Sequence, residues 1–279
     1  MDSVIPIIDT HLHLIYKDRF AYPWLAGAPH IDAQWTAQSY FAAAVPLGIE
    51  KALHMEVDAA ESDMLAETAF MQTVHPRVVG AIAACRPEHD GFAAHLEKLA
   101  ALGNVRGLRR ILHEVPNDVS QVPVFAENLN LLTRYGFTFD LCLFARQLHL
   151  GMALIDKCPD VQFVLDHCGN PDIAGDVYAP WAASIADLAR RPNVAVKISG
   201  IVTNAKKPSW TVSDLKPYFD HLLESFGWDR MVWGSDHPVL TGNATLAQWV
   251  EATRALIADA SEAEQTKLLN GNASRIYRL

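Results

Sequence analysis

The chain has 279 residues, half of them hydrophobic and 20% charged, which is typical of a soluble globular protein with one large domain. Its net charge is −9 and it has no long cluster of Lys or Arg, so the sequence argues against nucleic acid as a partner. The N-terminus lacks the basic and apolar regions of a signal peptide, and no apolar run reaches the length of a membrane span. We therefore expect a cytoplasmic protein that does not contact a membrane.

Eight short apolar runs rich in Val, Ile and Leu recur along the chain, and segments with helical periodicity lie between them. Such runs are typical of strands that are buried on both faces of a parallel sheet. The expected strands are 4–9, 52–57, 78–85, 105–112, 138–143, 162–167, 194–199 and 231–236, and the expected helices are 59–73, 91–102, 123–135, 148–157, 179–190, 213–226 and 245–257. This alternation predicts an α/β fold, a single closed (β/α)₈ TIM barrel over residues 1–279.

The longest connection follows the first predicted strand, over residues 14–36, and it is rich in aromatic residues. A long loop in a compact domain usually has a function. We expect its residues Trp24, His30 and Trp35 to shape a substrate pocket. The alternative is that the two tryptophans only pack the loop.

Several predicted strands end in polar residues, among them Glu56, Arg109, Asp140, Asp166 and Lys197. In a barrel of this type the active site is built where the strands end, at the carboxyl face. Polar residues that are far apart in sequence are therefore expected to meet there. For Glu56 the alternative is an ion pair with an arginine, and for Lys197 it is a place in the barrel interior.

The sharpest motif is His11-Leu12-His13, at the end of the first predicted strand. Residues two apart on a strand point to the same side, about 7 Å apart along it. The two imidazoles can therefore face one metal ion or one polarised carbonyl. Two hydrogen-bonded histidines in an ordinary loop are the structural alternative, and the place at a strand end favours the functional interpretation.

His167 and Asp236 end two further predicted strands, the sixth and the eighth. Each alone has a structural interpretation, as a satisfied histidine or a salt-bridged carboxylate. A carboxylate at the end of a buried strand is seldom left unpaired. Both residues would point into the same barrel mouth as His11 and His13, which predicts a four-residue site.

These motifs together resemble the amidohydrolase superfamily, and more narrowly its branch of sugar-lactone hydrolases and pyrone-dicarboxylate lactonases. The resemblance spans nearly the whole chain. It rests on Ile8-Asp9-Thr10-His11-Leu12-His13, Asp166-His167-Cys168-Gly169-Asn170-Pro171, Lys197-Ile198-Ser199-Gly200, Gly234-Ser235-Asp236-His237-Pro238 and Gly271-Asn272-Ala273-Ser274-Arg275-Ile276-Tyr277. Tyr22-Pro23-Trp24-Leu25 favours the sugar-lactone side.

The resemblance implies a role for each matching residue. Asp236 would be the general base that activates water, and His11, His13 and His167 would polarise the carbonyl, directly or through a metal. Arg109 would hold a substrate oxygen. Many metal-bearing members have a bridging Lys or Glu on strand four and a His on strand five, where this chain has Arg109-Arg110 and Cys142.

The resemblance therefore implies at most one divalent ion, zinc, held by His11, His13, His167 and Asp236. Imidazole and carboxylate ligands suit zinc. Whether hydrolysis requires the ion stays open, as does the oligomeric state, homo-oligomers included. Asn170 is a further departure, because the branch often has Lys at that position.

The predicted function is hydrolysis of a small lactone, most simply a sugar lactone such as L-fuconolactone. The alternatives are a 2-pyrone-4,6-dicarboxylate lactonase, which should display several arginines, a metal-dependent decarboxylase of the same superfamily, and a non-catalytic barrel. A serine nucleophile is not expected because the sequence has no GxSxG motif. Cys168 adjoins His167, but neighbouring residues on a strand point to opposite faces, which argues against a thiolate nucleophile.

Overall fold

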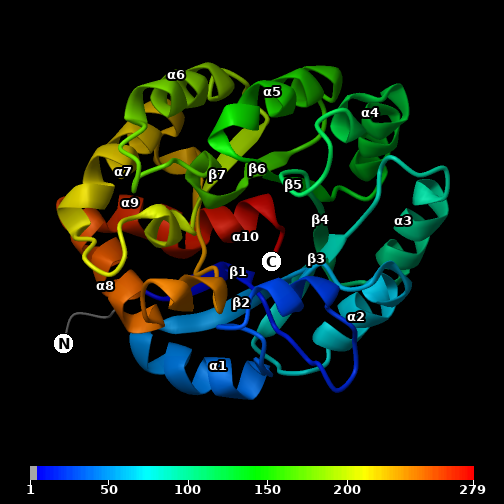
Figure 1. The fold of residues 1–279 in the computed structure, drawn as a ribbon, viewed down its shortest axis with the longest axis horizontal. Coiled ribbons are helices and arrows are strands. Elements are labelled where there is room, and N and C mark those ends of the chain that lie inside the picture. The colour runs from blue at the N-terminus through cyan, green and yellow to red at the C-terminus, as the bar shows by residue number, and fades with distance from the viewer. Residues whose placement is uncertain (1–4) are drawn as a thin grey trace.

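A computed structural model describes residues 5–279 and contains one sheet of eight parallel strands that pair in chain order. Helices surround the strands, so that sheet and helices form two concentric layers (Figure 1). The strands are β1 (Ile7–Leu12), β2 (Ile49–Met55), β3 (Val78–Ala84), β4 (Val105–Ile111), β5 (Thr138–Cys142), β6 (Phe163–Leu165), β7 (Val194–Ile198) and β8 (Met231–Trp233). The predicted (β/α)₈ barrel is confirmed.

The first and last strands meet at their carboxyl ends. The backbone N–H of His13 donates to the carbonyl of His237 at 2.8 Å, and that of Asp236 donates to the carbonyl of His11 at 2.9 Å. The Thr10 hydroxyl donates to the carbonyl of Trp233 at 2.7 Å. The first and last strands are therefore adjacent, as predicted. The hydrogen bonds between them join the two segments that carry His11, His13 and Asp236.

Some predicted strand limits were wrong at the sixth and eighth strands, which are three residues long. His167, Cys168 and Asp236 have φ angles of 53°, 58° and 60°. Left-handed residues cannot continue a regular ladder, so β6 and β8 end before them. The first predicted strand, 4–9, begins at a residue outside the described range, and β1 extends beyond it to Leu12.

The helices are α1 (Ala37–Ala44), α2 (Met64–Met71), α3 (Phe92–Ala101), α4 (Pro123–Asn130), α5 (Leu148–Lys157), α6 (Tyr178–Leu188), α7 (Val212–Phe226), α8 (Leu246–Leu256), α9 (Glu262–Thr266) and α10 (Asn272–Ile276). The seven predicted helices correspond in order to α2 to α8, with limits that agree within a few residues, and α9 and α10 were not predicted. Helix α1 was not predicted, although Thr36 caps it by accepting a hydrogen bond from the Ser39 N–H at 3.2 Å. Within residues 5–279 no helix combines the length and apolar character needed to cross a membrane.

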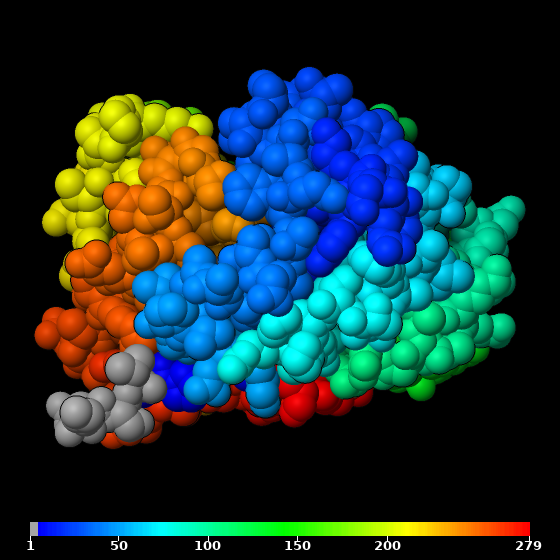
Figure 2. All heavy atoms as spheres, turned by 90° about the horizontal axis from the view of Figure 1, so that it is seen from below, coloured from blue at the N-terminus to red at the C-terminus, as the bar shows by residue number. Residues whose placement is uncertain are grey.

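The amino end of the barrel is closed by the C-terminus of the chain. Ile276 and Tyr277 pack on Leu53, Val164 and Val232, which point into the barrel from three strands. In Figure 2 the red C-terminal segment lies at one end of the molecule, and the dark blue loop that follows β1 rises at the other end. The open face is therefore the one at which the strands end.

The loop between β1 and α1 has a small hydrophobic core of its own. Ile15, Tyr22, Leu25 and Ile31 are buried there against Val57, which follows β2. An antiparallel bridge joins Ile15 to Trp35 and brings the two ends of the loop together. The loop is thus a folded cap beside the barrel mouth.

Candidate active site

A cavity of about 540 Å³ opens at the carboxyl ends of the strands. Cavities of about 300–1,000 Å³ are the usual size of small-molecule sites. His13, Arg109, His167 and Asp236 line it, together with Trp24 from the first loop. The structure therefore brings most of the predicted site residues together at one place.

His11 and His13 face each other at this mouth, with their Nε2 atoms 3.2 Å apart. The Nδ1 of His13 lies 3.1 Å from the carbonyl of Met55 and must donate to it, so the Nε2 lone pair of His13 points into the site. Burial lowers the pKa of His13 to about 3 and that of His11 well below its usual value. Both rings are therefore neutral at physiological pH.

His167 belongs to an unusual backbone turn. Residues 167–170 all have left-handed φ angles, between 50° and 71°, and three of them are not glycine. Such conformations are costly and tend to occur at functional sites. The turn seats the ring against Gly200, where an added Cβ would lie 2.5 Å from the His167 Nδ1. The same nitrogen is 3.1 Å from the Ser199 hydroxyl.

The position of Asp236 is set by Asp9. One oxygen of the Asp9 carboxylate accepts hydrogen bonds from the backbone N–H groups of His11 and Ser235, at 2.9 and 2.8 Å. The other oxygen accepts from the hydroxyls of Ser235 and Tyr40, both at 2.5 Å. This fully buried carboxylate ties the end of β1 to the segment after β8. It thereby fixes the histidine pair and the catalytic aspartate candidate relative to each other.

The Asp236 carboxylate lies at the centre of the three histidines. Its Oδ1 is 3.7 Å from the His11 Nε2 and 3.6 Å from the His13 Nε2, and its Oδ2 is 3.8 Å from the His167 Nδ1. Burial raises the pKa of Asp236 to about 6, against the opposing effect of His167 and Arg109. The group is thus ionised at neutral pH yet more basic than an ordinary carboxylate, which suits a general base.

A buried ion cluster lies beneath His11. Lys197 Nζ is 2.5 Å from Asp140 Oδ2, 2.9 Å from Asp166 Oδ1 and 3.3 Å from the Nδ1 of His11. Burial opposes the charge of Asp166, but Lys197 and His11 hold its pKa well below the usual value. Lys197 is fully buried and does not line the cavity, which favours its alternative interpretation, a place in the barrel interior.

The cluster offers His11 two hydrogen-bonding arrangements. The Lys197 ammonium can donate to Nδ1, which places the imidazole proton on Nε2, toward the cavity. Alternatively Nδ1 carries the proton and faces the Asp166 oxygen 3.4 Å away, which leaves the Nε2 lone pair free. The first arrangement makes His11 a donor in the site, and the second makes it a metal ligand.

Arg109 is held in place by Glu56. Its Nε donates to the Glu56 carboxylate at 2.7 Å and its Nη2 to the Glu56 carbonyl at 2.8 Å, while Nη1 lies 3.3 Å from the Nε2 of His11. Burial disfavours the charge of Glu56, yet Arg109 lowers the pKa of that carboxyl. Glu56 therefore has its alternative role, an ion pair with an arginine. Of the two residues, Arg109 lines the cavity and Glu56 does not.

The three predicted residues of the first loop have different positions. Trp24 lines the cavity and donates from Nε1 to the Val57 carbonyl at 2.7 Å. Trp35 donates to the Ile31 carbonyl at 2.9 Å and packs edge-on against His237, so it stabilises the loop. His30 is exposed and does not line the cavity, although its neighbours Ala28 and Ile31 do. Pocket roles for Trp35 and His30 are not supported by this geometry.

The cavity wall also contains residues that we did not predict, among them Asp58, His113 and Phe144. They lie in connections after β2, β4 and β5, where the sequence offers no periodic signal. Cys168 is buried behind the site, burial raises its pKa to about 12, and its thiol lies 3.6 Å from the Lys197 carbonyl. These features agree with the argument against a thiolate nucleophile.

The donor atoms suit a single metal ion. Tetrahedral zinc with bonds of about 2.0–2.1 Å separates its ligand atoms by roughly 3.4 Å. The Nε2 atoms of His11 and His13 and the Oδ1 of Asp236 are 3.2 to 3.7 Å apart, and His11, His167 and Asp236 also form a compact group of ligand atoms. The positive charge of the Arg109 guanidinium, which lies beside His11, would repel a bound cation. These residues therefore fit one metal ion, and Arg109 weakens its binding.

An eight-stranded parallel barrel with histidines and an aspartate at its carboxyl face is typical of amidohydrolase-type barrels, and the comparisons with known proteins agree. The amidohydrolase family model matches residues 8–279, and the chain belongs to this family.

Two curated relatives are named L-fucono-1,5-lactonase. The protein from Burkholderia multivorans is 28% identical over 98% of this chain and 96% of its own. The one from Burkholderia ambifaria is 31% identical over 67% of this chain and 66% of its own. A crystal structure of an amidohydrolase from Burkholderia multivorans with bound zinc has the same fold, with a TM-score of 0.90 at 24% identity over 98% of this chain and 99% of the other.

Proposed function

We propose that this protein is a cytoplasmic lactonase that hydrolyses a small sugar lactone such as L-fuconolactone. The observation that carries the proposal is the Asp236 carboxylate, set among three neutral histidines at the floor of a cavity of suitable size. The names of the two Burkholderia relatives support the lactone as substrate. The partner is a small molecule, and the acidic composition argues against nucleic acid.

Lactone hydrolysis needs a base for the attacking water and donors for the oxyanion that forms. Asp236 takes the proton from the water. In the arrangement set by Lys197 the imidazole N–H of His11 is a donor in the site, and the Arg109 guanidinium, which lines the cavity, is a second donor. His167 lies beside the other carboxylate oxygen. Protonated Asp236 then returns the proton to the leaving alkoxide.

A zinc ion, where bound, would be held by His11, His13, His167 and Asp236 and would polarise the carbonyl or a water molecule. The roles of the chain's own residues in binding and proton transfer stay the same. Asp236 remains the group beside the reacting atoms, and Arg109 still faces the substrate.

The alternatives differ in the charges they require. A pyrone-dicarboxylate substrate has two carboxylates and needs several arginines, but among the described residues that line this cavity the arginine is Arg109. This favours a lactone with a neutral ring. A decarboxylase is distinguished by its product, because it releases CO₂, whereas a lactonase releases one acid equivalent on ring opening.

The direct test is hydrolysis of a panel of aldonolactones, followed by a pH indicator, with and without a chelator. We expect acid release from sugar lactones that exceeds their spontaneous hydrolysis. Activity that survives the chelator would indicate that the residues suffice without a metal, and loss that zinc restores would indicate that one ion is required. Activity confined to dicarboxylate pyrones, or release of CO₂, would replace the proposal with one of the alternatives.

The pH dependence follows from the pKa of Asp236, about 6. The base must be ionised, so in chelator-treated enzyme kcat/KM should rise with pH and level off above about pH 7. At pH 5 it should be roughly tenfold below the plateau, since one pH unit below the pKa leaves about a tenth of the base ionised. A profile that is flat from pH 4.5 to pH 8, after subtraction of spontaneous hydrolysis, would contradict Asp236 as the base.

A further inference from the structure

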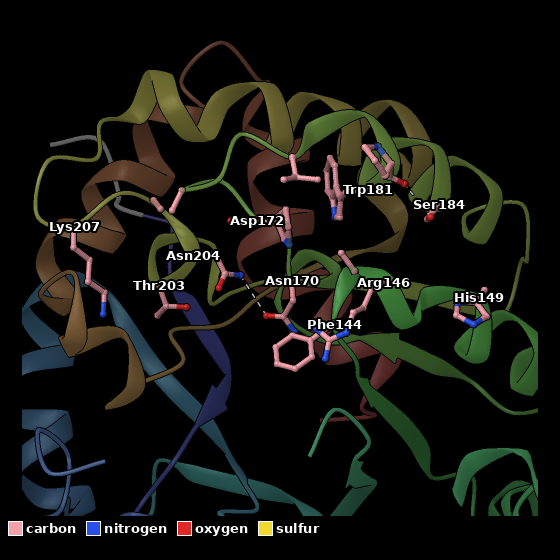
Figure 3. A pocket seen from close by; sticks show the side chains of 16 residues that line it. Phe144, Arg146, His149, Asn170, Asp172, Trp181, Ser184, Thr203, Asn204 and Lys207 are labelled. Atoms are coloured by element: carbon pink, nitrogen blue, oxygen red, sulfur yellow. Dashed lines mark hydrogen bonds between the residues drawn. The ribbon is translucent and has the colours of Figure 1, made fainter. Parts of the chain in front are cut away.

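A second cavity, of about 760 Å³, adjoins the catalytic cavity. It lies over the carboxyl ends of β5 to β7, between the start of α5, the loop before α6 and the 3₁₀ turn Ile201–Asn204 (Figure 3). Phe144, Asn170 and Thr203 line both cavities. We call the second cavity the side chamber; these three residues are the wall it shares with the catalytic site.

The shared wall is firmly built. Asn170 donates from Nδ2 to the Leu143 carbonyl at 2.8 Å, and its Oδ1 accepts from the amide of Asn204 at 3.3 Å (Figure 3). Its φ of 50° belongs to the left-handed turn that also places His167. The same short segment thus shapes the catalytic site on one side and the side chamber on the other. Because the same three residues line both cavities, the side chamber begins where the catalytic cavity ends.

The chamber offers positively charged donors. Arg146 stacks over the Phe144 ring at 4.4 Å, and Lys207 lines the opposite side (Figure 3). Both side chains are exposed, and within residues 5–279 neither forms an ion pair with a carboxylate. The chamber has one carboxylate, Asp172, and its Oδ1 already accepts a hydrogen bond from the Gly175 N–H at 2.8 Å.

Arg146 and Lys207 are thus two exposed cations at one cavity of a chain whose net charge is −9. Arg146 has its whole fork of N–H donors available, and such a fork matches the geometry of a carboxylate. Stacking on Phe144 holds the guanidinium at the shared wall. The chamber is therefore complementary to an acidic group that lies beyond the ring in the catalytic cavity.

We propose that the side chamber binds a carboxylated unit attached to the lactone ring, so that the substrate is an aldonolactone that carries a uronic acid or a similar acidic arm. This rests on the proposed lactonase function and deepens it. The ring occupies the site at Asp236, and the arm passes Asn170 and Thr203 to reach Arg146 and Lys207.

The test compares three lactones with the same ring: D-galactonolactone, the same lactone carrying a glucose unit, and the same lactone carrying a glucuronic acid unit. The glucose compound controls for size, so the comparison isolates the charge. For the wild-type protein we expect KM to be lowest for the glucuronic acid compound. In the double variant Arg146→Gln/Lys207→Gln that KM should rise about tenfold, as expected for the loss of two partly exposed charge contacts. The values for the two neutral lactones should not change.

Arg190→Gln serves as the matched control, because Arg190 is an exposed cation that lines neither cavity. It should leave all three KM values unchanged. Calorimetric titration with the ring-opened acids gives a readout that needs no turnover: the glucuronic acid product should bind more tightly than the glucose product, and the double variant should abolish the difference. Equal KM values for the two extended lactones, or a double variant that weakens all three alike, would overturn the side-chamber proposal while the lactonase function stands. Failure to hydrolyse any lactone would refute the proposed lactonase function. In that case the titration still tests the side-chamber proposal, because equal binding of the two ring-opened acids would refute it.

Discussion

Replacement of Asp236 by asparagine is expected to lower kcat on a sugar lactone by about 10²–10⁴-fold, the usual contribution of a general base. Asparagine keeps the size of the side chain but cannot take a proton from water. The carboxylate Oδ1 lies 3.6 Å from the His13 Nε2 and 3.7 Å from the His11 Nε2, so the substitution removes the proton acceptor from the centre of the histidines. Steady-state kinetics on the preferred lactone measures the effect.

The fold of this variant should be intact, and its thermal unfolding should show a stability at least equal to that of the wild type. Burial raises the pKa of Asp236 to about 6, so at neutral pH the ionised carboxylate lowers the stability of the folded protein relative to the unfolded chain, and a neutral amide removes that cost. Asp220→Asn, an exposed residue on α7, is the control for charge removal and should retain full activity. Full activity in Asp236→Asn would eliminate the mechanism.

Replacement of Lys197 by methionine is expected to destabilise the protein by about 3–5 kcal/mol, because breaking a buried ion pair leaves its partner charged and unpaired. Lys197 is fully buried between Asp140 and Asp166, at 2.5 and 2.9 Å, and methionine fills a similar volume without the charge. Urea unfolding at pH 7 measures the change. Activity should fall as well, because His11 loses the donor to its Nδ1.

Lys216→Met is the matched control. Lys216 forms an exposed pair with Asp220 at 2.8 Å, and such pairs contribute about 0.3–0.5 kcal/mol. The loss in the free energy of unfolding caused by Lys197→Met should also become smaller as the pH falls. Burial already raises the pKa of Asp140 to about 6, and without Lys197 that pKa rises further, so a proton neutralises the carboxylate at low pH. A stability within 1 kcal/mol of the wild type at pH 7 would contradict the role assigned to this cluster.

The sequence predicted the barrel because its hydrophobic residues follow a strand pattern and a helix pattern in turn along the chain. Each pattern depends only on which face of the element is buried. It also predicted His11, His13, His167 and Asp236, since all four follow apolar strands and a parallel barrel brings strand ends together. Helix α1 escaped prediction, as did the shortness of β6 and β8. Left-handed residues such as His167 and Asp236 end a strand without a change in hydrophobic pattern.

Only the tertiary structure decided which polar side chains face the substrate. Glu56 and Lys197 lie at strand ends, as Arg109 does. Glu56, however, accepts a hydrogen bond from Arg109, and Lys197 lies beneath His11. His30 and Trp24 share one loop, but of these two only Trp24 lines the catalytic cavity. The side chamber, likewise, joins segments from residues 144 to 207. Periodicity reports the burial of each element, whereas these contacts depend on how loops and turns orient side chains between elements that are distant in sequence.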